Sequence, residues 1–235
     1  MKSRKKAIGI IFIVVGIIII VSPFWIKQIS QNKMDEVINI IDYKKEILEE
    51  SDAEFENLNE KYLSELYKEM QKYNNNLYEN GQKIVDAFSY QNIDLDFAKY
   101  GIKENVIGKI KIPKIKIELP IYLGSTKENL NKGATILGET SMPLGTINAN
   151  TVIAAHRGLI RHPMFRNIDK LQINDEIEIT TFWDDLFYAV TDIKIIEPNE
   201  ASKILIQENK DMVTLITCHP YRINTQRYVV YCQRI

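Results

Sequence analysis

The sequence predicts a mainly β domain that follows a membrane anchor and a helical arm. From residue 106 onward, eight short runs of β-branched and apolar residues are separated by turns, with no helix of βαβ length between them. Eight short strands with this spacing indicate a barrel or a sandwich and exclude a doubly wound parallel sheet. Residues 1–80 instead combine one long uncharged run with helical periodicity.

Residues 7–26 form an uncharged run dominated by isoleucine and valine, about 30 Å long as a helix and able to cross a bilayer. Four basic residues precede the run and one follows closely, so the positive-inside rule predicts a cytoplasmic N-terminus and an extracellular main body. A cleaved signal peptide is the alternative, but no small-x-small cleavage pattern follows Val21. We therefore expect residues 1–33 to be a basic tail and an uncleaved single-pass anchor, with membrane lipid around residues 7–26.

Net charge is distributed unevenly along the chain. The whole chain has a net charge of −1, but residues 1–33 hold six basic residues and no acidic one, which leaves −7 on the remainder. An acidic main body argues against nucleic acid as a partner.

Residues 34–80 carry apolar side chains at helical spacing, and 34–105 form the expected arm and linker. The stripe fits a coiled coil between copies or an arm that packs on its own domain. We favour the packed arm because the stripe is irregular around Lys44-Lys45. We expect Ser51-Asp52 to separate two helices, and 74–76 and 80–81 to end them. The stripe consists of Met34, Val37, Ile41, Leu48, Phe55, Leu58, Tyr62, Leu66, Met70, Tyr73 and Leu77.

The β domain is expected to span residues 106–235. Its strands are predicted at 107–112, 115–122, 134–137, 151–156, 176–182, 187–196, 212–218 and 228–232. Single helical turns are expected within 127–132, 163–171 and 200–208.

The chain has two cysteines and therefore no disulfide framework. If Arg227 lies across a hairpin from Cys218, Cys232 is five residues farther along, about 16 Å away and facing the other side of the sheet. The two thiols are not expected to pair. A free extracellular thiol at a strand end then suggests a reactive role for Cys218.

Three strand ends carry side chains suited to nucleophilic catalysis. Cys218 follows an apolar β-branched run, Arg227 returns nine residues later, and His156 ends the run that begins at Thr151. Such residues can supply a nucleophile, a proton carrier and an oxyanion partner. His219 points away from Cys218 in an extended segment, and His162 lies in a polar segment and is expected at the surface.

No cofactor or metal is expected. The cysteines and histidines lack the spacing of a four-ligand zinc site, and no phosphate-binding loop, GxSxG elbow or EF-hand-like cluster is present.

These motifs resemble the sortase family. Residues 214–221 read Thr-Leu-Ile-Thr-Cys-His-Pro-Tyr and 224–227 read Asn-Thr-Gln-Arg, similar to the sortase signature in which TLxTC ends one strand and an arginine opens the next. Residues 119–122, 140–143 and 155–159 match at corresponding places, the last as Ala-His-Arg-Gly-Leu. The resemblance covers roughly residues 55–235 and implies an eight-stranded sortase-type β-barrel with short connecting helices.

Within that family the chain is most similar to class C, the pilin-polymerising group. The Cys-x-Pro-Tyr-x-Ile-Asn-Thr stretch and the helical N-terminal arm are typical of that class. Class C arms carry a lid with the motif Asp-Pro-Phe or Asp-Pro-Trp, where this chain has Asp86-Ala87-Phe88. The resemblance implies that Asp86 and Phe88 are lid residues.

The resemblance also implies a mechanism. Cys218 would attack an LPXTG-like sorting signal of a surface or pilin protein, His156 would carry the proton, and Arg227 would bind the substrate backbone or oxyanion. The acyl product would be joined to an amine, either a pilin lysine or a cell-wall peptide, with pilus assembly favoured. A sortase of another class that anchors proteins to the wall, a secreted thiol protease and a non-enzymatic interaction protein are the alternatives.

Overall fold

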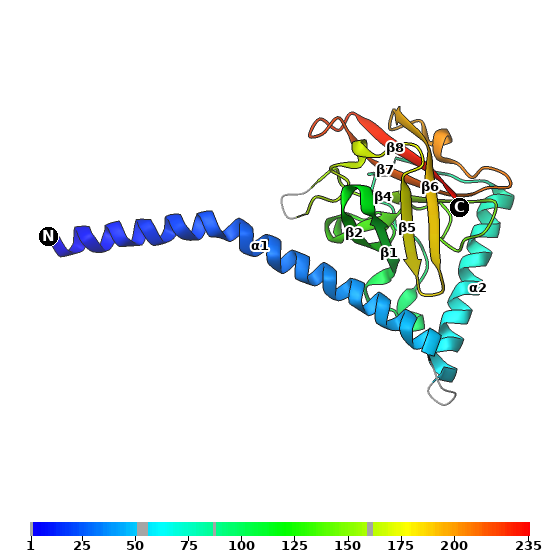
Figure 1. The fold of residues 1–235 in the computed structure, drawn as a ribbon, viewed down its shortest axis with the longest axis horizontal. Helices are drawn as coiled ribbons and strands as arrows, with labels where there is room; N and C mark the ends of the chain where they lie inside the picture. Colours follow the sequence, from blue (N-terminus) through cyan, green and yellow to red (C-terminus); the bar gives the residue numbers. More distant parts are fainter. Residues whose placement is uncertain (1, 51–55, 87, 159–161) are drawn as a thin grey trace.

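The computed structural model describes residues 2–50, 56–86, 88–158 and 162–235, and these form a β-barrel with two long helices (Figure 1). The expected helix break at Ser51-Asp52 lies outside the described residues, as do Ala87 of the lid motif and Leu159 of the histidine motif.

All eight expected strands are present, and they close into a barrel in the order β1-β2-β3-β4-β7-β8-β6-β5. Closure decides between the barrel and the sandwich. Neighbouring strands are antiparallel except for the parallel pairs β2–β3 and β4–β7. The strands are β1 Val106–Ile112, β2 Ile117–Leu123, β3 Ala134–Ile136, β4 Ala149–Ala154, β5 Glu176–Thr181, β6 Asp185–Ile196, β7 Asp211–His219 and β8 Gln226–Arg234.

Short helices lie in the connections, where single turns were expected. Thr126 caps the first helix because its hydroxyl accepts a bond from the amide of Asn129 at 3.1 Å. These helices are α3 Lys127–Lys132, η4 Ile168–Lys170 and η5 Ala201–Ile204, and three others, η1 Phe97–Tyr100, η2 Lys103–Asn105 and η3 Pro113–Ile115, flank β1.

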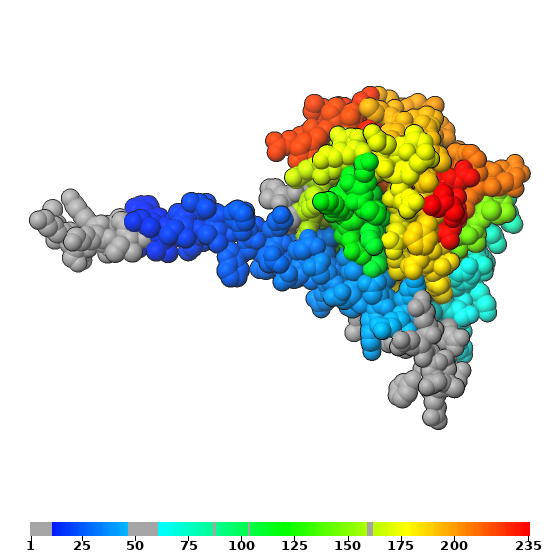
Figure 2. Space-filling view, in the orientation of Figure 1, coloured from blue at the N-terminus to red at the C-terminus, as the bar shows by residue number. Residues whose placement is uncertain are grey.

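The anchor and the first half of the arm form one helix, α1 Lys2–Glu50, which contains Pro23. The domain boundary expected at residue 33 therefore does not interrupt the backbone. The N-terminal half of α1 projects away from the barrel, whereas its second half runs along the barrel (Figures 1 and 2). Among the described residues, α1 is the one helix long and apolar enough to cross a membrane.

The arm packs on its own domain, as favoured from the sequence. Met34 and Ile41 of α1, and Leu66 and Met70 of α2 Glu56–Asn80, belong to the same buried cluster as the barrel core. Leu63 is buried whereas Tyr62 is exposed, so Leu63 takes the place of Tyr62 in the buried stripe of α2.

The expectation that residues 74–76 end a helix was wrong, because α2 continues to Asn80. Asn74 is buried, and its amide bonds both backbone groups of Met142: the Met142 amide donates to Oδ1 at 2.7 Å, and Nδ2 donates to the Met142 carbonyl at 3.0 Å. A residue typical of helix ends thus connects the arm to the loop after β3.

Two apolar clusters cover opposite faces of β4, β7 and β8. One contains Val213, Leu215 and Val230 and belongs to the main core. The other contains Ile216 and Val229, with Ile84 and Phe88 of the linker packed against it. Because side chains alternate along a strand, Cys218 and Arg227 share the face of the second cluster.

Replacing Asn74 with alanine should destabilise the docking of α2. The change leaves the buried amide of Met142 without a partner, at a cost of roughly 1–3 kcal/mol, whereas the Met142 carbonyl keeps a bond from the Leu144 amide at 2.9 Å. We expect the Tm of the full chain in detergent to fall by about 5 °C. Asn75→Ala, at an exposed position of the same helix, is the matched control; an equal loss in both variants would contradict this role of Asn74.

Candidate active site

Strand pairing brings the three expected catalytic residues to one end of the barrel. Ala154 at the end of β4 pairs in parallel with Ile216 of β7. His156 and Cys218 each lie two residues beyond that pair. On the other side of β7, Cys218 pairs directly with Arg227 of β8, as expected for a hairpin.

The backbone at His156 is held by bonds to β7. The Ala155 amide donates to the Ile216 carbonyl at 3.3 Å, and the buried Thr217 hydroxyl donates to the Ala155 carbonyl at 2.7 Å. The His156 carbonyl in turn accepts from the Phe165 amide at 3.0 Å. Thr217 was missed in the sequence analysis, although strand alternation already turned it to the face opposite Cys218.

The two expected lid residues both lie over this site. Asp86 accepts two bonds from Arg227, from Nε at 2.6 Å and from Nη2 at 2.7 Å. The Phe88 ring stacks on His156, with centroids 5.9 Å apart and planes 26° apart. The Arg227 guanidinium lies 5.2 Å from the centre of the same ring. Phe88 therefore contacts both the histidine and the arginine.

Arg227 is buried and almost fully bonded. Besides its two bonds to Asp86, Nη1 donates to the carbonyls of Asn224 at 3.0 Å and Gln226 at 2.8 Å. The guanidinium fork has five N–H groups, so these contacts use four of them. The two Nη1 contacts fix the arginine to its own loop, and the Asp86 carboxylate occupies the donors that face the site.

Burial moves the nucleophile and the histidine toward their neutral forms. Desolvation raises the pKa of Cys218, and the Asp86 carboxylate adds to the increase, although the positive charge of Arg227 opposes it. Desolvation also lowers the pKa of His156. Burial lowers the pKa of Arg227, but its hydrogen bonds and charge interaction with Asp86 outweigh this and raise it overall. Both shifts therefore favour the uncharged thiol and the uncharged imidazole.

A second polar network lies on the opposite face of the same strand ends. Arg157 contacts His219 (Nη1 to Nδ1, 2.5 Å), pairs with Asp169 at 3.0 Å and lies 5.3 Å from the centre of the Tyr228 ring. His219 and Tyr228 directly follow Cys218 and Arg227. Arg157 therefore connects the loop after His156 to the strands that carry the other two residues.

His162 was expected at the surface, and this was wrong. Its side chain is buried, and its Nε2 is in hydrogen-bond contact with the Ser30 hydroxyl of α1. A polar sequence neighbourhood did not show that α1 would cover this loop.

The second thiol lies apart from the site. Cys218 and Cys232 are both free, and Cys232 is buried where burial raises its pKa far above the ordinary value. Among the described residues, no three His, Cys, Asp or Glu side chains form a group that could hold a metal.

Comparison with known proteins agrees with this fold. Residues 110–235 match the sortase domain family. Sortase A of Bacillus anthracis is 33% identical over 150 residues, which are 63% of this chain and 70% of that protein. The crystal structure of sortase C from Streptococcus pneumoniae is 33% identical with a TM-score of 0.71, covering 84% of this chain and 96% of that one. Sortase C1 of group B Streptococcus pilus island 1 is 30% identical with a TM-score of 0.72, covering 86% and 92%.

A closed eight-stranded barrel with a cysteine, a histidine and an arginine at neighbouring strand ends defines a sortase-type cysteine transpeptidase. The chain belongs to the sortase family. Its structural neighbours include class C sortases, and family membership excludes the non-enzymatic alternative.

Asp86→Asn should lower the pKa of Cys218. The carboxylate raises that pKa, whereas Arg227 lowers it, so an uncharged amide leaves the arginine unopposed. We expect the pH profile of Cys218 alkylation, measured in a Cys232→Ala background, to move to lower pH. Glu197→Gln removes an equal charge from an acid bonded to Gln226 and is the control. An unchanged midpoint in Asp86→Asn would contradict electrostatic coupling between Asp86 and the thiol.

Proposed function

We propose that the chain is a membrane-anchored class C sortase that cleaves an LPXTG-like sorting signal and transfers the acyl product to an amine. A pilin lysine is the favoured amine, so that the reaction extends a pilus. The observation that carries the proposal is the contact of Asp86 and Phe88 with Arg227 and His156. Class C structural neighbours that this chain covers over more than nine-tenths of their length support it.

In the first half-reaction, the Cys218 thiolate attacks the carbonyl carbon of the Thr–Gly bond and forms a C–S bond. Arg227 stabilises the resulting oxyanion with its directional N–H donors. His156, as imidazolium, gives its proton to the departing glycine nitrogen as the C–N bond breaks. The products are a thioacyl enzyme and a free C-terminal peptide.

In the second half-reaction, the incoming amine attacks the thioacyl carbon while His156 takes its proton. The C–S bond breaks, an amide bond forms, and the Cys218 thiolate is restored with the imidazolium beside it. Atoms and charge balance over the two steps, so the reaction needs no cofactor or metal.

The Asp86–Phe88 segment acts as a lid in this proposal. The Asp86 carboxylate occupies the Arg227 donors that an oxyanion would use, and the Phe88 ring covers His156. A partly exposed carboxylate–guanidinium pair contributes only about 1 kcal/mol, so the lid closes the site yet opens readily.

The anchor determines where the reaction takes place. With the N-terminus cytoplasmic, as the basic residues before the anchor favour, the barrel lies outside the membrane where sorting signals emerge. A sortase of another class, which attaches proteins to the cell wall, is the second candidate, because the relatives of this chain also include proteins named sortase A, from Bacillus anthracis, and sortase D, from Bacillus subtilis.

Cys218→Ala should abolish cleavage of an LPXTG peptide and remove the thioacyl adduct seen by mass spectrometry. His156→Ala and Arg227→Ala should each lower kcat/KM by at least ~100-fold, the scale of a lost proton carrier or oxyanion donor. Turnover by the Cys218 variant, or near-normal activity in either of the others, would remove that residue from the mechanism.

Two matched variants control this experiment. Cys232→Ala removes the other thiol, which is buried and faces away, and should keep nearly full activity. Arg222→Ala removes an exposed arginine of the same loop and should leave kcat/KM for a soluble peptide nearly unchanged. Product analysis with a pilin-derived lysine peptide and with a cell-wall peptide identifies the acceptor, and preference for the wall peptide would overturn pilus assembly.

Removing the lid contacts should expose the thiol. In Asp86→Ala with Phe88→Ala, we expect Cys218 to react faster with a neutral thiol reagent at saturating pH, where the rate reports access and not ionisation. The Tm should change little because both positions are partly exposed. A double variant that reacts no faster than the parent would mean that residues 86–88 do not gate the site.

A further inference from the structure

We propose that the loop between β7 and β8, residues 220–225, docks on the headgroup layer of an anionic membrane beside the anchor. The inference rests on the proposed anchoring of α1 in the membrane. Anionic lipid headgroups are therefore a second binding partner of the catalytic domain itself, in addition to the lipid that surrounds the anchor.

The height of this end of the barrel follows from one contact to α1. The uncharged run ends at Ile26, and Ser30 is four residues later, about 6 Å farther along the helix axis. The polar headgroup region of a bilayer is about 5–8 Å deep on each side. Since Ser30 contacts His162, we infer that His162, in the connection after β4, lies at the level of the headgroups.

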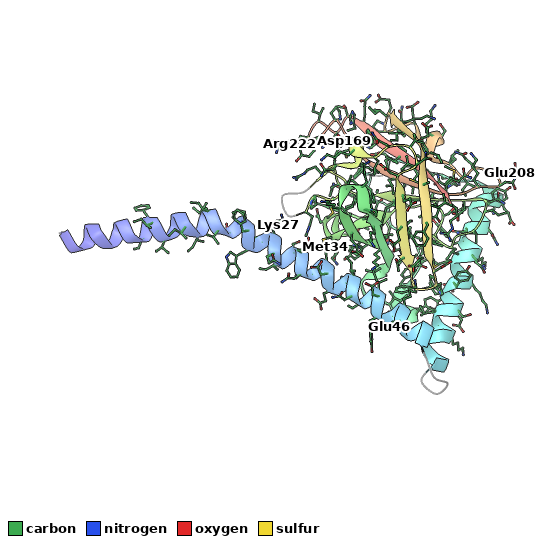
Figure 3. All side chains as sticks on the ribbon, in the orientation of Figure 1. Lys27, Met34, Glu46, Asp169, Glu208 and Arg222 are labelled. Atoms are coloured by element: carbon green, nitrogen blue, oxygen red, sulfur yellow. The ribbon has the colours of Figure 1, made fainter. Side chains whose placement is uncertain are left out.

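The β7–β8 loop lies beside that loop and on the same side. Arg166, shortly after His162, contacts the Tyr221 ring with its guanidinium 5.8 Å from the ring centre. Figure 3 shows Arg222 on the side of the barrel from which the anchor projects. Lys27 of α1 lies on that side too, whereas Glu208 lies at the far edge of the barrel. In Figure 2 the orange-red surface of this loop likewise lies on the side from which α1 leaves.

The exposed side chains of the loop suit a membrane interface. Tyr221 is 41% and Ile223 is 66% exposed, and the exposed Arg222 between them lies 5.3 Å from the Tyr221 ring. Aromatic, aliphatic and cationic groups together are what headgroup regions favour. Residues 218–225 contain no acidic side chain. Each cation near an anionic surface adds attraction that salt screens.

The loop is already in a defined conformation. The amides of Ile223 and Asn224 both donate to the Pro220 carbonyl at 3.0 Å, and Arg222 and Asn224 have positive φ angles of 69° and 65°. The Asn224 carbonyl accepts a bond from Arg227. Docking therefore orders little additional chain and places Arg227 and Cys218 at a fixed height above the membrane.

A tryptophan probe in the full chain tests this proposal. Ile223→Trp, in a background without either native tryptophan (Trp25→Phe and Trp183→Phe), is reconstituted into vesicles of phosphatidylcholine with or without phosphatidylglycerol and with lipids brominated near the headgroups. We expect a blue-shifted emission and a bromolipid-dependent loss of intensity in anionic vesicles, with less of both in high salt. Adding Arg222→Glu to the same probe should abolish both the blue shift and the bromolipid-dependent loss of intensity.

The matched control is Ile147→Trp in the same background. Ile147 is 65% exposed, and the neighbouring Asn148 bonds the Asn209 amide, which follows Glu208 at the far edge of the barrel. Its emission should not respond to bromolipid. Equal quenching at both positions, or none at Ile223→Trp, would overturn the docking proposal.

Other outcomes separate this inference from the proposed anchor and from other occupants of the loop. Co-flotation of the parent chain with vesicles reports the anchor, so flotation without quenching at Ile223→Trp rejects the loop alone. If Ile223→Trp shows no quenching in vesicles but its emission shifts to the blue when a soluble LPXTG peptide is added, the loop binds substrate and not the membrane. A blue shift that depends on protein concentration would assign it to a second copy.

Discussion

The pairing of β7 with β8 is the constraint on which the site depends. Cys218 is directly opposite Arg227 because the hairpin register sets them so, and this register is fixed by the apolar pairs that precede them, such as Leu215 with Val230. A shift by one residue would turn either side chain to the opposite face and separate thiol from guanidinium. The parallel pairing of β4 with β7 then brings His156 to the same end.

Burial and charge act together on this arrangement. Covered by Phe88 and Asp86, the site favours a thiol and a neutral imidazole, because desolvation raises the pKa of Cys218 and lowers that of His156. Catalysis by the proposed route needs thiolate and imidazolium. Opening the lid reduces desolvation and removes the nearby carboxylate, and both changes favour the charged pair. In the proposed mechanism, the lid thus controls protonation as well as access.

Much of the fold and of the candidate site could be predicted from local sequence patterns. Short β-branched and apolar runs between turns predicted eight strands. The alternation of side chains along a strand predicted the face of Cys218 relative to Cys232, and the spacing from Cys218 to Arg227 predicted a hairpin pair. Tertiary contacts could not be predicted in this way. From the sequence alone Asn74 is typical of a helix end, and only the structure shows its bond to Met142. His162 is likewise typical of a surface residue, and only the structure shows its contact with α1. Thr217 and Arg157 hold the site through partners distant in sequence.

The continuity of α1 connects the anchor rigidly to the catalytic barrel. A single helix from residue 2 to residue 50 cannot rotate freely at the membrane surface as a flexible linker would, and one face of its second half packs against the barrel through Met34 and Ile41. The barrel is therefore held at one height and one orientation relative to the anchor. Since β7 ends and β8 begins on the side of the anchor, the proposed catalytic side chains lie close to the membrane surface in the proposed membrane orientation. For an enzyme whose proposed substrates emerge from that surface, a rigid connection reduces the orientational entropy lost when enzyme and substrate meet.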